Sequence, residues 1–324
     1  MSFRWLVRRS ISAVIVLLVA LVINFVIPRL MPGNPVDIFS GGVKLTEESR
    51  NAIIERFGLD LPVTSQFKHY LIQSLKGDFG LSFFYYPQKV TDVIFEALPW
   101  TLLIILTSLI LQVGVGYFLG ALSAWRAGSR TDSSLQTISI FIFSTPLFWV
   151  AMILLYLFGY KTGWFPLSGA YTIGADYGSL AERALDIARH ALLPVISLTI
   201  AQYASYQLIL RNSMVSVLKE QYILTARAKG LSHQRIKYVH AARNALLPMV
   251  TFLALSFAMS MGGCVFVETV FSYPGIGKLI LDSVISRDYP LLQGCFFMFS
   301  LVVILANICV DIVYQFLDPR IRME

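Results

Sequence analysis

The sequence carries little charge for its length. Only 14% of its 324 residues are Asp, Glu, Lys or Arg, whereas 56% are hydrophobic. Soluble globular domains contain about 25% charged residues. The composition therefore excludes an ordinary soluble domain and places the chain in a lipid bilayer.

Cysteine and histidine are also scarce, with three and four residues respectively. Cys264, Cys295 and Cys309 lie in apolar stretches without the short spacing of metal sites, which indicates small, buried hydrophobic side chains. The histidines lie far apart in the sequence and match no metal-ligand spacing. We therefore predict that this chain itself holds no metal ion and no cofactor.

Catalytic motifs are missing as well. The apolar runs contain no Ser-His-Asp set and no HExxH motif. Residues 275–278 read Gly-Ile-Gly-Lys, which is a fragment of a phosphate-binding loop. However, Ser272 stands where that loop needs Gly, and Leu279 stands where it needs Ser or Thr. We predict no catalytic residue and no ATP binding by this chain.

Six apolar runs are long enough to cross a bilayer as helices. We predict spans at residues 11–27, 98–125, 131–160, 191–217, 246–267 and 292–316. The first run follows an arginine-rich N-terminus, as in a signal peptide, but it is long for one, and Pro28 lies where a cleavage site would be expected. In the second run, Gly114, Gly116 and Gly120 are small enough for close helix packing. The predicted fold is an all-α integral membrane protein of six helices, the first of which stays attached.

The basic residues indicate how the chain is oriented. The net charge is +7, and the cations gather in short segments beside the apolar runs. With six spans, the N-terminus, residues 126–130, residues 219–243 and the C-terminus all lie on one side. The positive-inside rule assigns that side to the cytoplasm, whereas an odd number of spans would scatter the cations across both faces. The same distribution favours a membrane over nucleic acid as the partner.

The long polar segment after the first span is predicted to be an extracytoplasmic insertion. The predicted segments are residues 1–30 (cytoplasmic N-terminus and first span), 31–96 (insertion), 97–318 (transmembrane core) and 319–324 (cytoplasmic tail). Within the insertion, we predict one helix from Thr46 to Gly58. A second, amphipathic helix contains Phe67 and Tyr70 and ends at Gly77.

Residues 219–248 form a long basic and amphipathic stretch. Its pattern predicts a helix, a turn at Gly230 and a second helix. Tyr222, Ala226 and Gly230 lie four residues apart and would share one nearly bare face that a partner could approach closely. The basic side chains suit anionic headgroups or an acidic groove. The alternative is an ordinary positively charged loop.

Several of these residues resemble a known family. Tyr222, residues 225–231 (Thr-Ala-Arg-Ala-Lys-Gly-Leu) and residues 243–248 (Arg-Asn-Ala-Leu-Leu-Pro) resemble the cytoplasmic coupling loop of ABC importer permeases. The resemblance is to the first permease subunit of the dipeptide, oligopeptide and nickel branch. Residues 57–80 are similar to the extracytoplasmic insertion of that branch, and residues 268–277 to its segment after the fifth span. The resemblance covers nearly the whole chain and implies the type I permease fold.

Two features depart from the general loop motif of the family. Residues 224–226 read Leu-Thr-Ala where Glu-Ala-Ala is usual, and the Leu-Pro lies further from Gly230 than in sugar permeases. The peptide and nickel branch shares both departures. The residues that the resemblance assigns to ATPase coupling are Tyr222, Thr225, Ala226, Arg227, Ala228, Lys229, Gly230 and Leu231. Those assigned to an outer gate or substrate path are Glu268, Pro274, Gly275 and Gly277.

The resemblance also implies partners and a substrate class. It predicts a second related permease, two ATPase subunits that bind ATP and Mg, and an external substrate-binding protein, all at the cytoplasmic (inner) membrane of a prokaryote. Peptides are the expected substrate, with nickel, glutathione-like molecules and oligosaccharides as alternatives.

Two functions from other classes are alternatives to an importer. An ion-coupled secondary carrier normally needs acids near the middle of the bilayer. Glu268 and Asp311 are the acids nearest the apolar runs, and both lie toward span ends. Glu268 could meet a cationic substrate or cap a helix, and Asp311 could pack against Asn307 or a neighbouring subunit's cation. A membrane-embedded enzyme lacks the catalytic residues described above.

Overall fold

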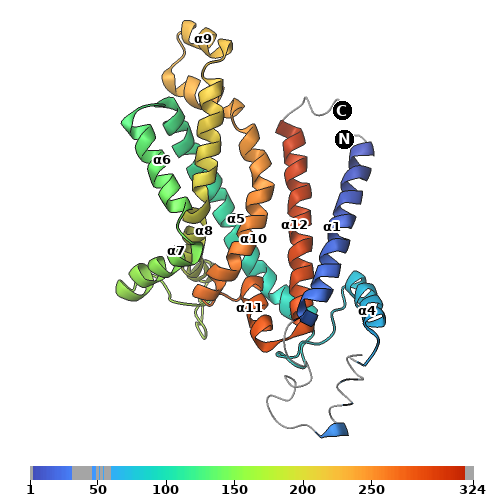
Figure 1. Cartoon of the computed structure of the whole chain (residues 1–324). Helices are drawn as coiled ribbons and strands as arrows, with labels where there is room; N and C mark the ends of the chain where they lie inside the picture. The colour runs from blue at the N-terminus through green and yellow to red at the C-terminus, as the bar shows by residue number, and fades with distance from the viewer. Residues whose placement is uncertain (1–2, 31–45, 49–50, 52–53, 55–59, 318–324) are drawn as a thin grey trace. The chain divides into compact units, whose positions relative to one another are not determined.

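The computed structural model describes residues 3–30, 46–48, 51, 54 and 60–317, and these are almost entirely helical (Figure 1). Apart from helices, the described residues form one isolated antiparallel bridge, between Leu81 and Lys89. Most of the helix predicted between Thr46 and Gly58 lies outside the described residues. The chain forms two compact units. Unit 1 comprises Met1–Thr101 and Pro274–Ile304, and unit 2 comprises Leu102–Tyr273 and Leu305–Glu324.

Five of the described helices are long and apolar enough to cross a membrane. They are α1 (Phe3–Leu30), α5 (Val90–Trp125), α8 (Leu180–Val217), α10 (Leu247–Val270) and α12 (Tyr289–Leu317). These helices cover five of the six predicted spans. The number rises to six when a sharply bent pair of helices is counted as one span.

The bent pair corrects the prediction of a continuous third span. Helix α6 (Arg130–Phe143) and the segment formed by α7 (Leu147–Leu154) and the π-helix η1 (Leu155–Lys161) meet at 96°. Pro146 precedes α7, and a residue followed by Pro is disfavoured in the helical conformation. The hydroxyls of Ser144 and Thr145 donate to the carbonyls of the preceding turn, at 2.9 and 3.0 Å. These local bonds end α6, although the apolar run continues.

In unit 1, α1 packs against α4 (Val63–Lys76) through aromatic rings. The Phe25 ring lies 5.0 Å from the Phe67 ring and 5.6 Å from the Tyr70 ring, measured between centroids. Gly77 ends α4 in the left-handed conformation, with φ 74°. This confirms the second helix predicted in the insertion, including the apolar face and the residue that ends it.

A buried carboxylate organises the turn between α11 (Ile276–Ser286) and α12 in unit 1. Asp288 accepts hydrogen bonds from the Ser82 hydroxyl, from the Phe84 N–H at 2.9 Å and from the Leu291 N–H at 3.1 Å. Burial raises the pKa of Asp288 above its usual range, and the bonds from Phe84 and Ser82 act in the opposite direction. The carboxylate therefore fixes the segment around the isolated bridge to the start of α12.

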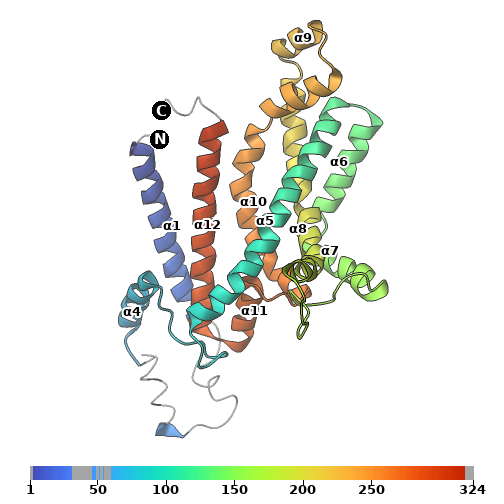
Figure 2. The ribbon, with the colours of Figure 1, turned by 180° about the vertical axis from the view of Figure 1, so that it is seen from behind.

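In unit 2, α8 packs against α6, α7 and α10 (Figures 1 and 2). Helix α5 also approaches α8 closely, because its glycines leave room. A Cβ added at Gly116 would lie 2.3 Å from the Tyr206 Cβ, and one at Gly120 would lie 2.8 Å from the Gln207 carbonyl oxygen. The prediction of close packing is therefore confirmed for these two glycines. Gly114 has no such neighbour within 4 Å.

Hydrogen bonds from amide and hydroxyl side chains connect the helices of unit 2. Gln112 of α5 donates to the Leu198 carbonyl of α8 and accepts from Ser256 of α10, both at 3.3 Å. Gln202 of α8 donates to Ser260 of α10 at 3.1 Å. Such bonds hold helices together in a bilayer, where the hydrophobic effect no longer drives helix association.

Candidate coupling site

Unit 2 carries a short helical loop, residues 219–243, which we call the α9 loop. It contains α9 (Gln221–Ala228) and the π-helix η2 (Arg235–Ala242). Gly230 lies between them with φ +72°, and its N–H donates to the Arg227 carbonyl at 2.9 Å. The Leu231 N–H donates to the Ala226 carbonyl at 3.3 Å. This is a left-handed helix end, and it confirms the predicted helix, glycine turn and second helix.

The inner face of the α9 loop belongs to the core of unit 2. Ile223 and Ala226 of α9 are buried together with Ile236, Ala241 and Ala242 of η2. The same cluster includes Ala121 and Ala124 of α5, Tyr206, Leu210 and Met214 of α8, Ala245, and Met249 of α10. The loop is therefore not a free appendage, because it shares one core with the adjoining ends of α5, α8 and α10.

The exposed face of the α9 loop differs from the predicted one. The exposed residues of the predicted coupling set are Tyr222, Thr225, Arg227, Ala228, Lys229 and Gly230, while Leu231 is half-buried. Ala226 is only 6% exposed and faces the core. The row of Tyr222, Ala226 and Gly230 is thus divided and is not one bare outer face. Ala226 lies three residues after Ile223, on the stripe that packs inward, and its small side chain lets α9 approach its own core.

Polar and aromatic contacts hold the α9 loop against α5 and the start of α10. The Asn244 side chain donates to the Tyr222 hydroxyl at 2.8 Å. The Arg227 guanidinium lies over the Trp125 ring, 5.9 Å from its centroid, and the His233 ring meets the same indole edge-on at 5.8 Å. Each cation–π contact of this kind contributes about 0.5–1 kcal/mol at an exposed site.

The α9 loop is strongly cationic. Its segment 221–243 contains no Asp or Glu, and its basic residues are Arg227, Lys229, Arg235, Lys237 and Arg243. Lys237 is buried, with its ammonium 4.6 Å from the centroid of the Tyr238 ring, and the other four are exposed. The outer surface therefore suits an acidic partner.

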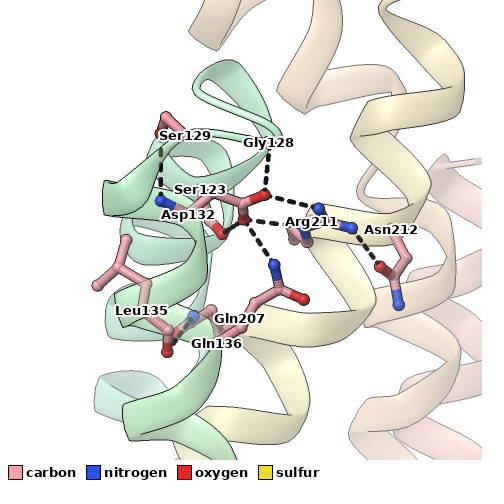
Figure 3. A network of polar contacts seen from close by, with 9 residues as sticks. All are labelled: Ser123, Gly128, Ser129, Asp132, Leu135, Gln136, Gln207, Arg211 and Asn212. Atoms are coloured by element: carbon pink, nitrogen blue, oxygen red, sulfur yellow. Dashed lines mark hydrogen bonds and ion pairs between the residues drawn. The ribbon is translucent and has the colours of Figure 1, made fainter.

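Beside the core of the α9 loop, a buried ion pair joins α6 to α8 (Figure 3). Asp132, which is 2% exposed, accepts from Arg211 Nη2 at 2.7 Å and from Arg211 Nε at 3.1 Å. It also accepts from the Gly128 N–H and the Gln136 amide, each at 2.9 Å, and from the Ser123 hydroxyl. All of these donors converge on one carboxylate, so its charge is fully compensated.

An amide extends this connection along α6 and α8. Gln207 accepts from the Ser139 hydroxyl at 2.7 Å and donates to the Leu135 carbonyl at 3.2 Å. Together with the shared core, these bonds make the α9 loop and the adjoining ends of α5, α6, α8 and α10 one packed body. No local pattern predicts the pairing of Asp132 with Arg211, because they lie 79 positions apart.

The residues predicted to form an outer gate belong to different units. Glu268 lies in the last turn of α10 in unit 2, and its side chain is fully buried. Pro274, Gly275 and Gly277 lie in unit 1, where Gly275 precedes α11. The Ile276 N–H donates to the Thr101 hydroxyl at 2.8 Å, which fixes the start of α11. The gate assignment stays a prediction.

The long apolar helices and the cationic loop seated on their ends define a helical, multi-span membrane protein. The chain belongs to the family of binding-protein-dependent transport system inner membrane components. Its family model matches residues 116–323, and the model of the corresponding N-terminal region matches residues 2–105. The family resemblance found in the sequence is thereby confirmed, and the chain is a permease of the ABC importer type.

Curated relatives match over nearly the full length of the chain. A probable peptide ABC transporter permease of Sinorhizobium fredii is 36% identical over 98% of this chain and 99% of its own length. The oligopeptide transport system permease protein AppB of Bacillus subtilis is 34% identical over the same shares of the two chains. The glutathione transport system permease protein GsiC of Escherichia coli is 34% identical over 99% of both chains.

A solved structure shares the fold at low sequence identity. It is described as an inward-facing conformation of the MetNI methionine ABC transporter, in its CY5 native crystal form. The match has a TM-score of 0.56 and 14% identity, and it covers 70% of this chain and 96% of that one. The predicted type I importer permease fold is therefore confirmed.

Proposed function

We propose that this chain forms half of the translocation pore of an ATP-driven importer of di- or oligopeptides. The observation that carries the proposal is the α9 loop, which combines a cationic exposed surface with an inner face in the core of the membrane helices. The names of the relatives support the substrate class, since they include peptide and oligopeptide permeases. Glutathione is a second candidate substrate, because one relative is named for its transport.

Coupling requires no chemistry in this chain. Two partner ATPase subunits bind ATP and Mg, and a groove on one of them receives the α9 loop. The contacting side chains are the exposed ones, with Tyr222, Thr225 and Ala228 on α9 and Lys229 at its end. Ala226 acts from the inner side, because it allows α9 to sit on its own core. A displacement of α9 then moves the adjoining ends of α5, α6, α8 and α10 as a rigid body.

Charge orients this contact. Four exposed cations on α9 and η2 outnumber the one acid of the loop, Glu220 at the start of α9, so an acidic groove attracts the loop over about 10 Å at 0.1 M salt. Arg227 is held over Trp125, so its charge is presented in a fixed position. By the positive-inside rule, the same cations support a cytoplasmic position for the α9 loop. The complete transporter then contains a second permease, two ATPases and an external binding protein in the inner membrane.

The test is purification of the chain with its partners, followed by transport in proteoliposomes. We expect a second permease and two P-loop ATPases to co-purify, and binding-protein-dependent uptake of radiolabelled peptide that requires ATP. Competition by unlabelled dipeptide, longer peptide or glutathione then identifies the substrate class. Uptake by this chain alone under an ion gradient, without ATPases, would overturn the proposal.

A further inference from the structure

The segment formed by α7 and η1 has a different relation to the membrane from the long helices of unit 2. It turns by 96° from α6 and comprises 8 residues of α7 and 7 of η1. Helix α6 begins close to the α9 loop, and α8 runs back to that loop, so the chain reverses direction between them (Figures 1 and 2). Helix α6 thus leads away from the α9 loop, and α8 leads back to it. The segment of α7 and η1 belongs to the connection between these two helices.

One side of this segment packs against its own unit. Ala151 and Gly159 are buried, and a Cβ added at Gly159 would lie 2.9 Å from Leu167 Cδ2. Helix α7 contacts α8 and α10, and a Cβ at Gly263 of α10 would lie 2.9 Å from Leu147 Cδ2. The segment is therefore held in place and is not a loose connection.

The opposite side is exposed and uniformly apolar or aromatic. Before Lys161, its exposed side chains include Phe148, Trp149, Met152, Ile153, Tyr156 and Tyr160. They recur at steps of one or three to four residues and so form one stripe along the segment. No charged residue occurs from 133 to 160. A helix face of this kind, with Trp, Phe and aliphatic side chains, is one that inserts into the boundary between headgroups and acyl chains.

Aromatic residues gather at the far end of the stripe. The rings of Tyr156 and Tyr160 stack with centroids 5.9 Å apart, and Trp164 follows beside Phe158 at the same centroid distance. Tyr and Trp are enriched where the acyl chains of a bilayer meet its headgroups, because one end of the side chain is apolar and the other polar. Lys161 begins the polar connection that continues to α8.

The length of α6 places the bend in the far leaflet, below the headgroups. Its 14 residues cover about 21 Å, which is shorter than a hydrocarbon core of about 30 Å. The bend at Ser144 and Pro146 therefore falls inside the leaflet opposite the α9 loop. A segment leaving at nearly a right angle from a crossing helix then runs along the membrane, at the depth that its aromatic side chains favour.

We infer that α7 and η1 lie in the plane of the outer membrane interface and that the apolar stripe is inserted into lipid. The stripe binds the headgroup and acyl-chain boundary of the bilayer and keeps the connection between α6 and α8 at a constant depth. Three observations support the in-plane position: the bend between α6 and α7, the exposed apolar stripe, and the reversal of the chain between α6 and α8. Its assignment to the outer leaflet rests on the proposed function, which puts the α9 loop in the cytoplasm.

Spin-label depth measurements test this placement. In a variant with Cys264, Cys295 and Cys309 replaced by Ala, single cysteines are introduced at Met152 and Tyr160, eight residues apart, and labelled with a nitroxide. Ile110 and Phe118 of α5 are the matched control, since they are also eight apart, apolar and exposed. The complex with its partner subunits is reconstituted in phosphatidylcholine vesicles. Accessibility to oxygen and to a water-soluble nickel complex then gives the depth of each label.

We expect the two labels on the stripe to lie at the same depth to within about 3 Å, whereas the control pair differs by about 12 Å along a crossing helix. A difference between Met152 and Tyr160 equal to that of the control pair would show that the segment crosses the membrane. Low accessibility to both reagents would show that a protein covers the stripe, and high accessibility to nickel alone would show that water does. Each of these three results overturns the inference.

Two further measurements separate this inference from the proposed function. ATP-driven uptake by each labelled variant shows that it is folded and assembled. A membrane-impermeant maleimide added to cells reports the side of the membrane through Thr162→Cys, just beyond η1. Reaction from outside is expected. Protection from the external reagent, with equal label depths, would refute the outer-leaflet placement and the proposed orientation, but not the in-plane position.

Discussion

The two ends of unit 2 present opposite surfaces. At the end that carries the α9 loop, apolar side chains are buried in a shared core and the exposed surface is cationic. At the end that carries α7 and η1, the exposed stripe is apolar and aromatic, although the segment is also packed on one side. In both places a short helix is seated on the long helices. The outer face therefore distinguishes the surface proposed for a soluble, charged partner from the surface proposed for lipid.

Replacing a carboxylate at either end of unit 2 is expected to give the largest difference between the two ends. Asp132, near the α9 loop, is buried and paired with Arg211, whereas Asp186, near the other end, is partly exposed and accepts from Thr172 and the Tyr177 hydroxyl. We expect Asp132→Ala to lower the free energy of unfolding by about 3 kcal/mol, because Arg211 is left without its partner. Asp186→Ala should cost less, about 1.5 kcal/mol, the low end for hydrogen bonds to a charged group, because no buried cation loses its partner.

Thermal unfolding of the purified chain in detergent, followed by tryptophan fluorescence, measures both variants. Uptake and ATP hydrolysis by the reconstituted complex show whether the α9 loop is still coupled. Equal destabilisation by the two substitutions would mean that the buried pair adds nothing beyond its hydrogen bonds.

Ala226 and Ala228 provide a sharper contrast within one helix. Ala226 faces the core and Ala228 faces outward, two residues apart. We expect Ala226→Phe to destabilise the chain by about 1–3 kcal/mol, because the core has no room for a ring. Ala228→Phe should leave the melting temperature unchanged but separate ATP hydrolysis from transport, since the ring holds α9 away from the ATPase. If Ala226→Phe unfolded like the wild type and Ala228→Phe did not, the assignment of the two faces would be reversed.

Substitutions at Gly230 distinguish the cost of backbone strain from the exclusion of a side chain by a partner. Its φ of +72° is unfavourable for other residues, but a Cβ there would meet nothing within 4 Å. We expect Gly230→Val to cost about 1–2 kcal/mol through the backbone alone. Gly230→Asn should cost less, because Asn tolerates the left-handed conformation. Coupling measured as peptide transported per ATP hydrolysed should follow the same order. An Asn variant as impaired as the Val variant would instead indicate that the partner excludes any side chain at this position.

Local patterns predicted several features of the fold. The apolar runs predicted the long helices, and Gly77 and Gly230 predicted where α4 and α9 end, because a left-handed helix end depends on the residue itself. The break after α6 also had a local signal in Ser144, Thr145 and Pro146. It was missed because the apolar run continues through it, so hydropathy alone does not distinguish one long span from a bent one.

Other features depend on contacts between distant parts of the chain. The inward orientation of Ala226 depends on Ala121 and Met214, which are remote in sequence. The amphipathic pattern showed that α9 has two faces but not which of them meets its own core. Asp132 lies at the start of the predicted third span, and its pairing with Arg211 forms only when α6 packs against α8.

Substitutions at Tyr222 are expected to change stability least. They distinguish the contact made by the ring from the hydrogen bond made by the hydroxyl. Its hydroxyl accepts from Asn244 at an exposed position, where one hydrogen bond contributes about 0.5–1 kcal/mol. We therefore expect Tyr222→Phe to lower stability slightly and to retain coupling, because the ring still reaches the ATPase groove. Tyr222→Ala should lose coupling with a similarly small change in stability. The ratio of peptide uptake to ATP hydrolysis measures this difference. If the Phe variant were as uncoupled as the Ala variant, the bond to Asn244, which links α9 to the start of α10, would transmit the motion instead of the ring.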